Sequence, residues 1–292
     1  MRGQCKLCLE QSDLQLSHIV PAFVFKWLKK DGHIRHAENI DRRVQDGDKD
    51  YLLCAACEQR LNSWETQFAN NVFHPINADE RTLVRYDSWL LKFCVSISWR
   101  ALVHISNKAR LNHFSASQSA HVEKALDTWR KYMMDELPHP GKYEQHLIPF
   151  SIIENTGSFK FPPNINRYLL RNVELDAAAG SESAFVYSKL GRFGIFGFID
   201  VVCPKEWKGT KIHVRNGAVG PRTYELPRSL GTYLSDRATK AWDLMKTMSE
   251  NQQRKVDGTI EANPERFLNS EVFQAMQQDI KMFGEQAFAR KK

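Results

Sequence analysis

Two pairs of cysteines have the residue type and the spacing of a metal site. Cys5 and Cys8 form one Cys-x-x-Cys pair near the start of the chain, and Cys54 and Cys57 form a second. Each pair presents two sulfurs on a tight turn, so four thiolates together can close a tetrahedral Zn²⁺ site with Zn–S bonds of about 2.3 Å. Four protein ligands leave no position open for the water that a catalytic zinc needs. The spacing therefore predicts a structural zinc, with two disulfides or two unrelated cysteine pairs as the alternative.

A histidine and two oxygen-bearing side chains accompany this cysteine frame. Residues 16–21, Leu-Ser-His-Ile-Val-Pro, are typical of a short strand that carries His18 and is stopped by proline. Residues 57–65 favour a helix, because good helix formers dominate and apolar residues recur at helical spacing. Glu58 and Asn62 are four residues apart and would share one face of that helix. A hairpin histidine beside oxygen ligands on the following helix is a plausible one-metal hydrolytic site.

At these residues the chain resembles the HNH, or ββα-metal, endonuclease superfamily, in the subgroup whose fold is held by two Cys-x-x-Cys knuckles. The resemblance covers about residues 5–70, a quarter of the chain. It implies that His18 deprotonates the attacking water, as the histidine of the family's Asp-His-Ile-Ile-Pro-like string does. It also implies that Glu58 and Asn62 hold a catalytic Mg²⁺ or Mn²⁺ ion against the scissile phosphate of a nucleic acid, with DNA favoured.

Three positions depart from the family pattern. Ser17 stands where the family usually carries Asp, Glu or His, and a serine hydroxyl is a poor metal ligand. Glu58 replaces the commoner His or Asn, although a carboxylate suits Mg²⁺ or Mn²⁺ well. The asparagine that orients the base in the family has no clear equivalent, and Asp46 and Asp48 are the nearby candidates. These departures leave open a module that has lost catalysis and kept its shape.

Basic residues cluster between the two cysteine pairs, beside three aromatic residues. The whole chain has a net charge of +7, which is compatible with binding phosphate backbones but does not require it. The residues predicted to bind nucleic acid are Lys26, Lys29, Lys30, Arg35, Arg42 and Arg43. The alternative is a solvated helix face whose apolar side packs inward. His33 and His36 lie in the same stretch and are assigned no role.

The whole sequence predicts an α+β protein with a zinc-stapled ββα-type module over residues 1–75 and an α+β domain over residues 76–292. Residues 79–137 favour helices, including a buried helix over 86–105 that is apolar nearly all round and a second helix capped by Ser115 or Ser117. Residues 144–220 favour mainly antiparallel strands, because parallel crossovers need a dozen or more residues between strands. These strands are predicted at 146–150, 168–175, 184–187, 193–202 and 211–214. Residues 228–289 favour helices, over 228–255 and 265–289.

The start of the chain and its apolar runs bear on the cellular compartment. Met1 lies just before the first knuckle, so we expect no signal peptide. No apolar run approaches the eighteen or so residues that span a membrane. We therefore expect a reducing cytoplasm, where thiolates bind zinc instead of pairing. Cys94 and Cys203 lie in apolar stretches, which predicts buried and inert thiols.

Three functions are compatible with these patterns. The favoured one is a metal-dependent endonuclease, for which the resemblance implies a prokaryotic anti-phage defence or mobile-element setting. The second is a catalytically inactive zinc module that binds DNA or RNA, supported mainly by Ser17. The third is a protein-interaction or scaffold protein, in which zinc stabilises the N-terminal fold and apolar helices build a homo-oligomer or bind a partner protein.

Overall fold

The computed structural model describes residues 1–36, 38–157, 159–181 and 183–288, and it has the predicted α+β architecture. The chain divides into two compact units. Unit 1 comprises Met1–Pro21, Gly47–Pro149 and Val173–Glu225, and unit 2 comprises Ala22–Asp46, Phe150–Asn172 and Leu226–Lys292. The units interleave along the chain, so residues 22–46, which lie inside the predicted N-terminal module, belong to unit 2.

Unit 1 begins with a three-stranded antiparallel sheet that leads directly into a helix. The strands lie in the order β1–β2–β5, with β1 at Arg2–Gln4, β2 at Gln11–His18 and β5 at Lys49–Cys54. Helix α2 (Ala55–Phe68) starts at the residue after β5. It runs on through a π-helical turn (Ala69–Phe73) into α3 (His74–Ala78). The antiparallel pair β2–β5, whose strands are separated in the chain by residues 19–48, is followed by α2, which gives the ββα order that the sequence predicted.

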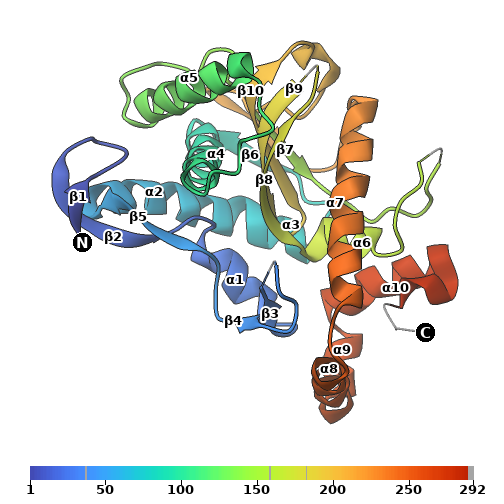
Figure 1. Ribbon diagram of the computed structural model, residues 1–292. Helices are drawn as coiled ribbons and strands as arrows, with labels where there is room; N and C mark the ends of the chain where they lie inside the picture. Colours follow the sequence, from blue (N-terminus) through green and yellow to red (C-terminus); the bar gives the residue numbers. More distant parts are fainter. Residues whose placement is uncertain (37, 158, 182, 289–292) are drawn as a thin grey trace. The chain divides into compact units, whose positions relative to one another are not determined.

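A four-stranded antiparallel sheet forms the main core of unit 1. Its strand order is β7–β10–β9–β8, with β7 at Gln145–Pro149, β8 at Val173–Ala179, β9 at Ser183–Leu190 and β10 at Phe193–Val201. Helices α4 (Trp89–Asn107) and α5 (Ala116–Met133) cover one face of this sheet (Figure 1). The packing is close at Gly197, where a Cβ atom would lie 2.7 Å from Ser98 Oγ of α4 and 2.9 Å from the Trp129 ring of α5.

Helix α4 confirms the predicted buried helix. Nearly all its side chains are buried, because it lies between the four-stranded sheet and α2. Phe93 of α4 stacks on Phe68 of α2 with ring centroids 4.0 Å apart, and Phe68 meets Phe193 of β10 edge-on at 5.4 Å. This aromatic layer joins the ββα part of unit 1 to its main sheet. A helix apolar all round is stable in water only when neighbours cover it on several sides.

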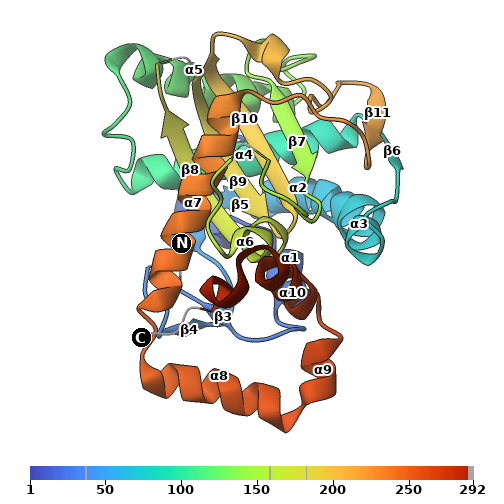
Figure 2. The same cartoon turned by 90° about the vertical axis from the view of Figure 1, so that its right-hand side faces the viewer.

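Unit 2 is mainly helical. Its elements are α1 (Ala22–Leu28), β3 (Ile34–Arg35), β4 (Arg43–Val44), α6 (Ile165–Arg171), α7 (Arg228–Lys246), α8 (Glu250–Ala262), α9 (Pro264–Leu268), α10 (Glu271–Phe283) and a short 3₁₀ turn (Gly284–Ala287). Helix α10 packs against α6, and α8 is followed end to end by α9 (Figure 2). Arg171 ties the unit together, because its guanidinium lies 2.8 Å from Asp31, 3.1 Å from Glu271 and 3.8 Å from the ring centre of Trp27.

The first half of one predicted strand is a helix. Residues 168–175 were predicted to be extended, but α6 ends at Arg171 and β8 starts only at Val173. A short buried apolar run suits either a helix or a strand. The buried Asp279 carboxylate on α10 accepts the backbone N–H groups of Asn166 (2.8 Å) and Arg167 (3.3 Å), which are unpaired at a helix start. This partner lies more than a hundred residues away, so the local sequence could not indicate the helix.

A second predicted strand lies a few residues further along the chain. Residues 211–214 form no strand, and Lys211 makes only an isolated bridge with His146. The strand of this region is β11 (Asn216–Val219), which pairs antiparallel with β6 (Val84–Asp87). Because β6 falls inside the stretch predicted as helical, its pairing with β11 was not expected.

The two long C-terminal helices of the prediction are interrupted. The helix predicted over 228–255 ends at Lys246, and the next helix starts where the Ser249 hydroxyl accepts the Gln252 N–H. The helix predicted over 265–289 is divided in the same way at Ser270, which caps α10. Serine caps inside helix-forming stretches are the signal that was missed. The predicted end at residue 289 lies outside the described residues. Among the helices of the described part, none is long and apolar enough to cross a membrane.

Candidate functional site

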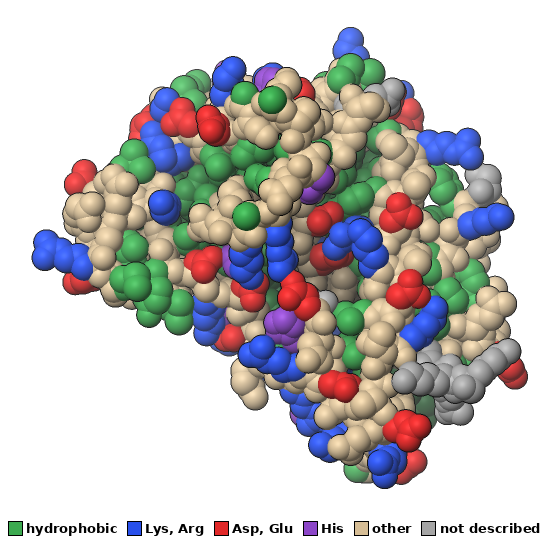
Figure 3. All heavy atoms as spheres, in the orientation of Figure 1, with side chains coloured by type: hydrophobic (Ala, Val, Ile, Leu, Met, Phe, Trp, Pro, Cys, Tyr) green, Lys and Arg blue, Asp and Glu red, His purple; other side chains and the backbone are tan. Residues whose placement is uncertain are grey.

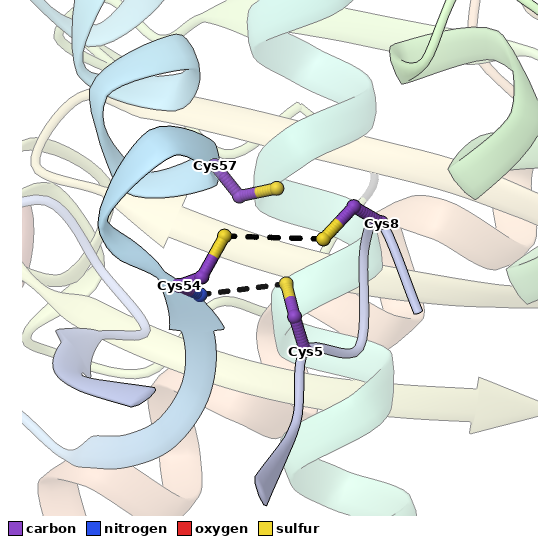
Figure 4. A group of neighbouring side chains, drawn as sticks. All are labelled: Cys5, Cys8, Cys54 and Cys57. Atoms are coloured by element: carbon purple, nitrogen blue, oxygen red, sulfur yellow. Dashed lines mark hydrogen bonds between the residues drawn. The ribbon is translucent and has the colours of Figure 1, made fainter. Parts of the chain in front are cut away.

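The sulfur atoms of Cys5, Cys8, Cys54 and Cys57 all lie within 4.8 Å of one another. They come from the turn after β1, the end of β5 and the first turn of α2, and they point toward a common centre (Figure 4). Four sulfurs arranged tetrahedrally at about 2.3 Å from one zinc ion are separated by roughly 3.8 Å. The Cys8 and Cys54 sulfurs are 3.8 Å apart. The four cysteines therefore could hold a metal ion such as zinc, and none of them forms a disulfide.

Backbone hydrogen bonds shape the first cysteine turn for this role. The Leu9 N–H donates to the Cys5 carbonyl oxygen (2.9 Å), and Leu9 itself has a φ of 67°, in the left-handed region. The Lys6 N–H donates to the Leu52 carbonyl of β5 (2.8 Å), which fixes the turn beside the second pair. Arg130 of α5 donates to the Leu7 carbonyl oxygen (3.4 Å). The turn is thus attached both to its own sheet and to the helical layer of unit 1.

The environment of Cys5 favours its thiolate. Burial by itself would raise the pKa of Cys5, but backbone N–H groups, first that of Cys54, lower it to about 7. The Cys54 N–H lies 3.4 Å from the Cys5 sulfur. Burial raises the pKa of Cys57, and it raises that of Cys8. Since a metal binds thiolates, binding to this cluster must release protons.

His18 is the last residue of β2 and lies opposite Lys49 at the start of β5. Its neighbour Ser17 is buried and lies opposite Asp50. Because successive strand residues point to opposite faces, the His18 side chain lies on the sheet face opposite to that of Ser17 and Asp50. Asp50 faces helix α4, where its carboxylate meets His104 at 2.5 Å. The Ser17 side chain, just before His18, therefore points into the packed interior of unit 1.

Glu58 and Asn62 both lie on α2, one helical turn apart. Among the described residues, no group donates a hydrogen bond to Glu58 Oε1, although that atom is buried. A buried carboxylate oxygen without a donor is costly, and a cation would compensate it. Asn62 is exposed, and no other described group of three or more His, Cys, Asp or Glu ligand atoms converges as the four cysteines do. The structure thus shows one buried Glu58 oxygen without a donor, and it gathers no group of three or more such ligand atoms around Glu58 among the described residues.

Arg100 on α4 fastens the end of β2 to the end of α2. Its guanidinium is buried, and its Nη1 donates to the His18 carbonyl oxygen (2.9 Å). Its Nη2 lies 2.7 Å from Glu65 Oε1 of α2, in contact but without hydrogen-bond alignment. Its Nε donates to the Ser96 carbonyl one turn earlier (3.3 Å). Arg100 is not among the residues predicted for the site, and its signal in the sequence is an arginine within a mainly apolar helix.

His104, one turn further along α4, lies between two carboxylates. Its Nδ1 is 2.5 Å from Asp50 and its Nε2 is 3.0 Å from Asp48, which also meets Lys108 Nζ at 2.9 Å. A neutral imidazole has one N–H, so only the protonated ring can donate to both carboxylates. The hydrogen bond to Asp48 accordingly raises the pKa of His104 against the opposing effect of burial. The pKa of Asp48 is lowered by the same contact. Asp48, a candidate for orienting His18, therefore pairs with His104 and Lys108.

We expect this pair to make stability depend on pH. The pKa of Asp48 is lower in the folded protein, so its contribution to stability is complete above its unfolded pKa of about 3.9 and is lost as the pH falls. The pKa of His104 is higher in the folded protein, so its contribution is complete below its unfolded pKa of about 6.5 and is lost as the pH rises. Replacing His104 with glutamine should therefore cost about 1.5 kcal/mol near pH 6, or about 3–6 °C in Tm, and less near pH 9. Thermal unfolding at both pH values measures the difference. The exposed His213→Gln change serves as control, and an equal loss at both pH values would argue against a charged His104.

The six predicted nucleic-acid-binding residues all lie in unit 2, whereas His18, Glu58 and Asn62 lie in unit 1. Lys26, Lys29, Lys30, Arg42 and Arg43 are exposed, and Arg35 is half-buried. Of the remaining cysteines, Cys94 is buried on α4 as predicted, and burial raises its pKa. Cys203 is exposed, so the prediction of a buried thiol is wrong there. It lies at the end of the main sheet, after β10, where the chain leaves the core.

Comparison with known proteins gives no further guide to the site: no protein-family model, no curated protein and no solved structure matches the chain.

Proposed function

We propose that this protein is a metal-dependent endonuclease of the HNH-like type, with His18 as the general base and Glu58 and Asn62 as ligands of a catalytic Mg²⁺ or Mn²⁺ ion. The observation that carries the proposal is the order of elements around the cysteine cluster. Strand β2 ends at His18, its antiparallel partner β5 ends at Cys54, and α2 begins at once with Glu58 in its first turn. This is the arrangement that the resemblance requires of a ββα nuclease.

Each residue has a defined task in this proposal. His18 accepts the proton of the attacking water. A general base in this role raises the reaction rate by roughly 10²–10⁴-fold. Glu58 supplies a carboxylate oxygen that lacks a hydrogen-bond donor among the described residues. A divalent cation bound there would stabilise the negative charge that develops on the phosphate and the leaving oxygen. The cysteine cluster holds β2, β5 and α2 together but takes no part in the chemistry, because four protein ligands leave no position for water.

A catalytically inactive zinc module that binds nucleic acid is the second candidate. Ser17, which precedes the proposed base, is buried on the face of Asp50 and offers no carboxylate to a metal. In addition, the four cysteines are the one group of three or more His, Cys, Asp or Glu ligand atoms that converges within the described residues. These two observations favour a module that binds without cutting.

Cleavage assays on a panel of plasmid, linear duplex, single-stranded DNA and RNA test the proposal. We expect cutting that requires added Mg²⁺ or Mn²⁺, and we expect His18→Ala to reduce its rate by about 10²–10⁴. The matched control is His213→Ala, which removes an exposed histidine of the same unit. The metal content of each protein is measured first, because His18→Ala should keep the structural metal.

The outcomes separate the candidates. Metal-dependent cutting that is lost in His18→Ala and kept in His213→Ala supports the nuclease. Equal cutting by both variants would show that the base lies elsewhere. Binding without cleavage, in a protein that carries its structural metal, would move the assignment to the inactive module.

A further inference from the structure

The two-stranded ribbon of unit 2 places two arginines side by side. Strands β3 and β4 are antiparallel, and Arg35 lies directly opposite Arg43. Like charges on directly opposite residues destabilise a strand pair. A ribbon of two residues per strand has few hydrogen bonds with which to offset this repulsion. The pairing therefore indicates that something other than the ribbon itself compensates the charge.

Arg35 is held in place by neutral groups. Its Nη1 donates to the Ile40 carbonyl oxygen (2.8 Å) and to the side-chain oxygen of Gln252 on α8 (3.3 Å). Its Nη2 is enclosed and has no hydrogen-bond partner among the described residues. Burial first, and then Arg43, lower the pKa of Arg35, while the charge of Asp41 opposes them. Asp41 Oδ1 accepts the Ser249 N–H, so it is already engaged at the start of α8.

Exposed positive groups surround this fixed charge. Arg42 and Arg43 are both exposed, and His33 is exposed just before β3. The pKa of His33 is lowered by partial burial and by the positive charges of Arg43 and Arg35. In the region of the β3–β4 ribbon, the surface shows Lys or Arg side chains beside a histidine, with acidic side chains close by (Figure 3). The ribbon thus sets the exposed Arg43 opposite the fixed charge of Arg35, with exposed Arg42 next to it in the chain.

We propose that the β3–β4 ribbon is a phosphate-binding site, in which the exposed Arg43 contacts the anion and Arg35, opposite it on the partner strand, supplies a fixed charge, with exposed Arg42 next to Arg43 in the chain. The assignment of a nucleic-acid backbone as the source of that phosphate rests on the proposed function. An anion between the arginines would turn the repulsion across the ribbon into shared attraction. The site also divides the six basic candidates, because Lys26 on α1 and Lys29 and Lys30 in the turn after it are exposed but are not paired across a ribbon with another basic residue.

Binding of a fluorescent oligonucleotide, measured without Mg²⁺ or Mn²⁺ over a range of salt concentrations, tests the site. Arg43→Ala should weaken binding about tenfold and lower the slope of log affinity against log salt by about one. Lys29→Ala also removes one positive charge from unit 2, but it should weaken binding by less than about fivefold. Arg43→Ala should also leave the thermal stability unchanged or raised, because it relieves the repulsion with Arg35. A purely structural arginine would lower stability instead.

Competition identifies the source of the phosphate. If inorganic phosphate and a nucleoside monophosphate displace the oligonucleotide only at concentrations that act as bulk salt, the ligand is the polymer backbone. If either displaces it at low concentration from the wild type, and less readily from Arg43→Ala, the site takes a small phosphate. Unchanged affinity and salt slope in Arg43→Ala, or equal losses in Lys29→Ala, would overturn the proposal. Cleavage plays no part in the assay, so its result is independent of whether His18 is a catalytic base.

Discussion

Replacing Cys57 with serine is expected to remove the metal from the protein and to unfold the N-terminal part of unit 1. Cys57 lies in the first turn of α2 and is one of four sulfurs within 4.8 Å of one another. Structural zinc contributes about 10 kcal/mol or more to folding in small zinc domains. Here β1, β2 and β5 form a short sheet beside the cluster, whereas the four-stranded sheet has its own apolar core. We therefore expect the loss to be concentrated in β1, β2, β5 and the start of α2.

Metal analysis and hydrogen exchange measure this effect. The wild type should carry one zinc per chain and Cys57→Ser much less, with faster amide exchange in β2 and β5 than in β9 and β10. The control is Cys203→Ser, which removes an exposed thiol outside the cluster. A Cys57→Ser protein that retains a full equivalent of zinc, or that exchanges like the wild type, would contradict a structural metal at this site.

Replacing Arg100 with methionine is expected to lower the free energy of unfolding by about 3 kcal/mol, which corresponds to about 6–12 °C in Tm. The methionine keeps much of the volume, but it leaves the Glu65 carboxylate and the His18 carbonyl oxygen without their cation. Glu65 is only 16% exposed, so water compensates it poorly. Because the same guanidinium contacts the end of β2, the proposed cleavage activity should also be lower in Arg100→Met, even at temperatures where the protein stays folded.

A double variant separates the ion pair from simple packing. In Arg100→Met/Glu65→Leu no charge is left behind, so the double variant should be more stable than Arg100→Met alone. Arg85→Ala, which removes an exposed arginine on β6, should change stability by less than about 0.5 kcal/mol. A loss in Arg100→Met no greater than that of Arg85→Ala would show that the buried guanidinium is dispensable.

Elements with a strong local signal were predictable from the sequence. The apolar pattern of α4 needs cover on all sides, and the serine before α5 is confirmed as its cap, with the Ser115 hydroxyl accepting the Gln118 N–H (3.2 Å). The strands β7, β9 and β10 also follow the predicted runs. Where the prediction failed, the deciding partner lay far along the chain. Helix α6 depends on Asp279, and β11 depends on β6.

For the site, the sequence by itself identified the four cysteines, because two Cys-x-x-Cys pairs have the residue type and the spacing of a four-thiolate centre. The tertiary structure alone decided what surrounds the end of β2. It brings Arg100 of α4 to the His18 carbonyl oxygen and His104 of α4 to the carboxylates of Asp48 and Asp50. It also buries Ser17. It also sets Arg35 opposite Arg43. The physical reason is that a metal-ligand pattern is local, whereas ion pairing and burial depend on which distant segments fold against one another.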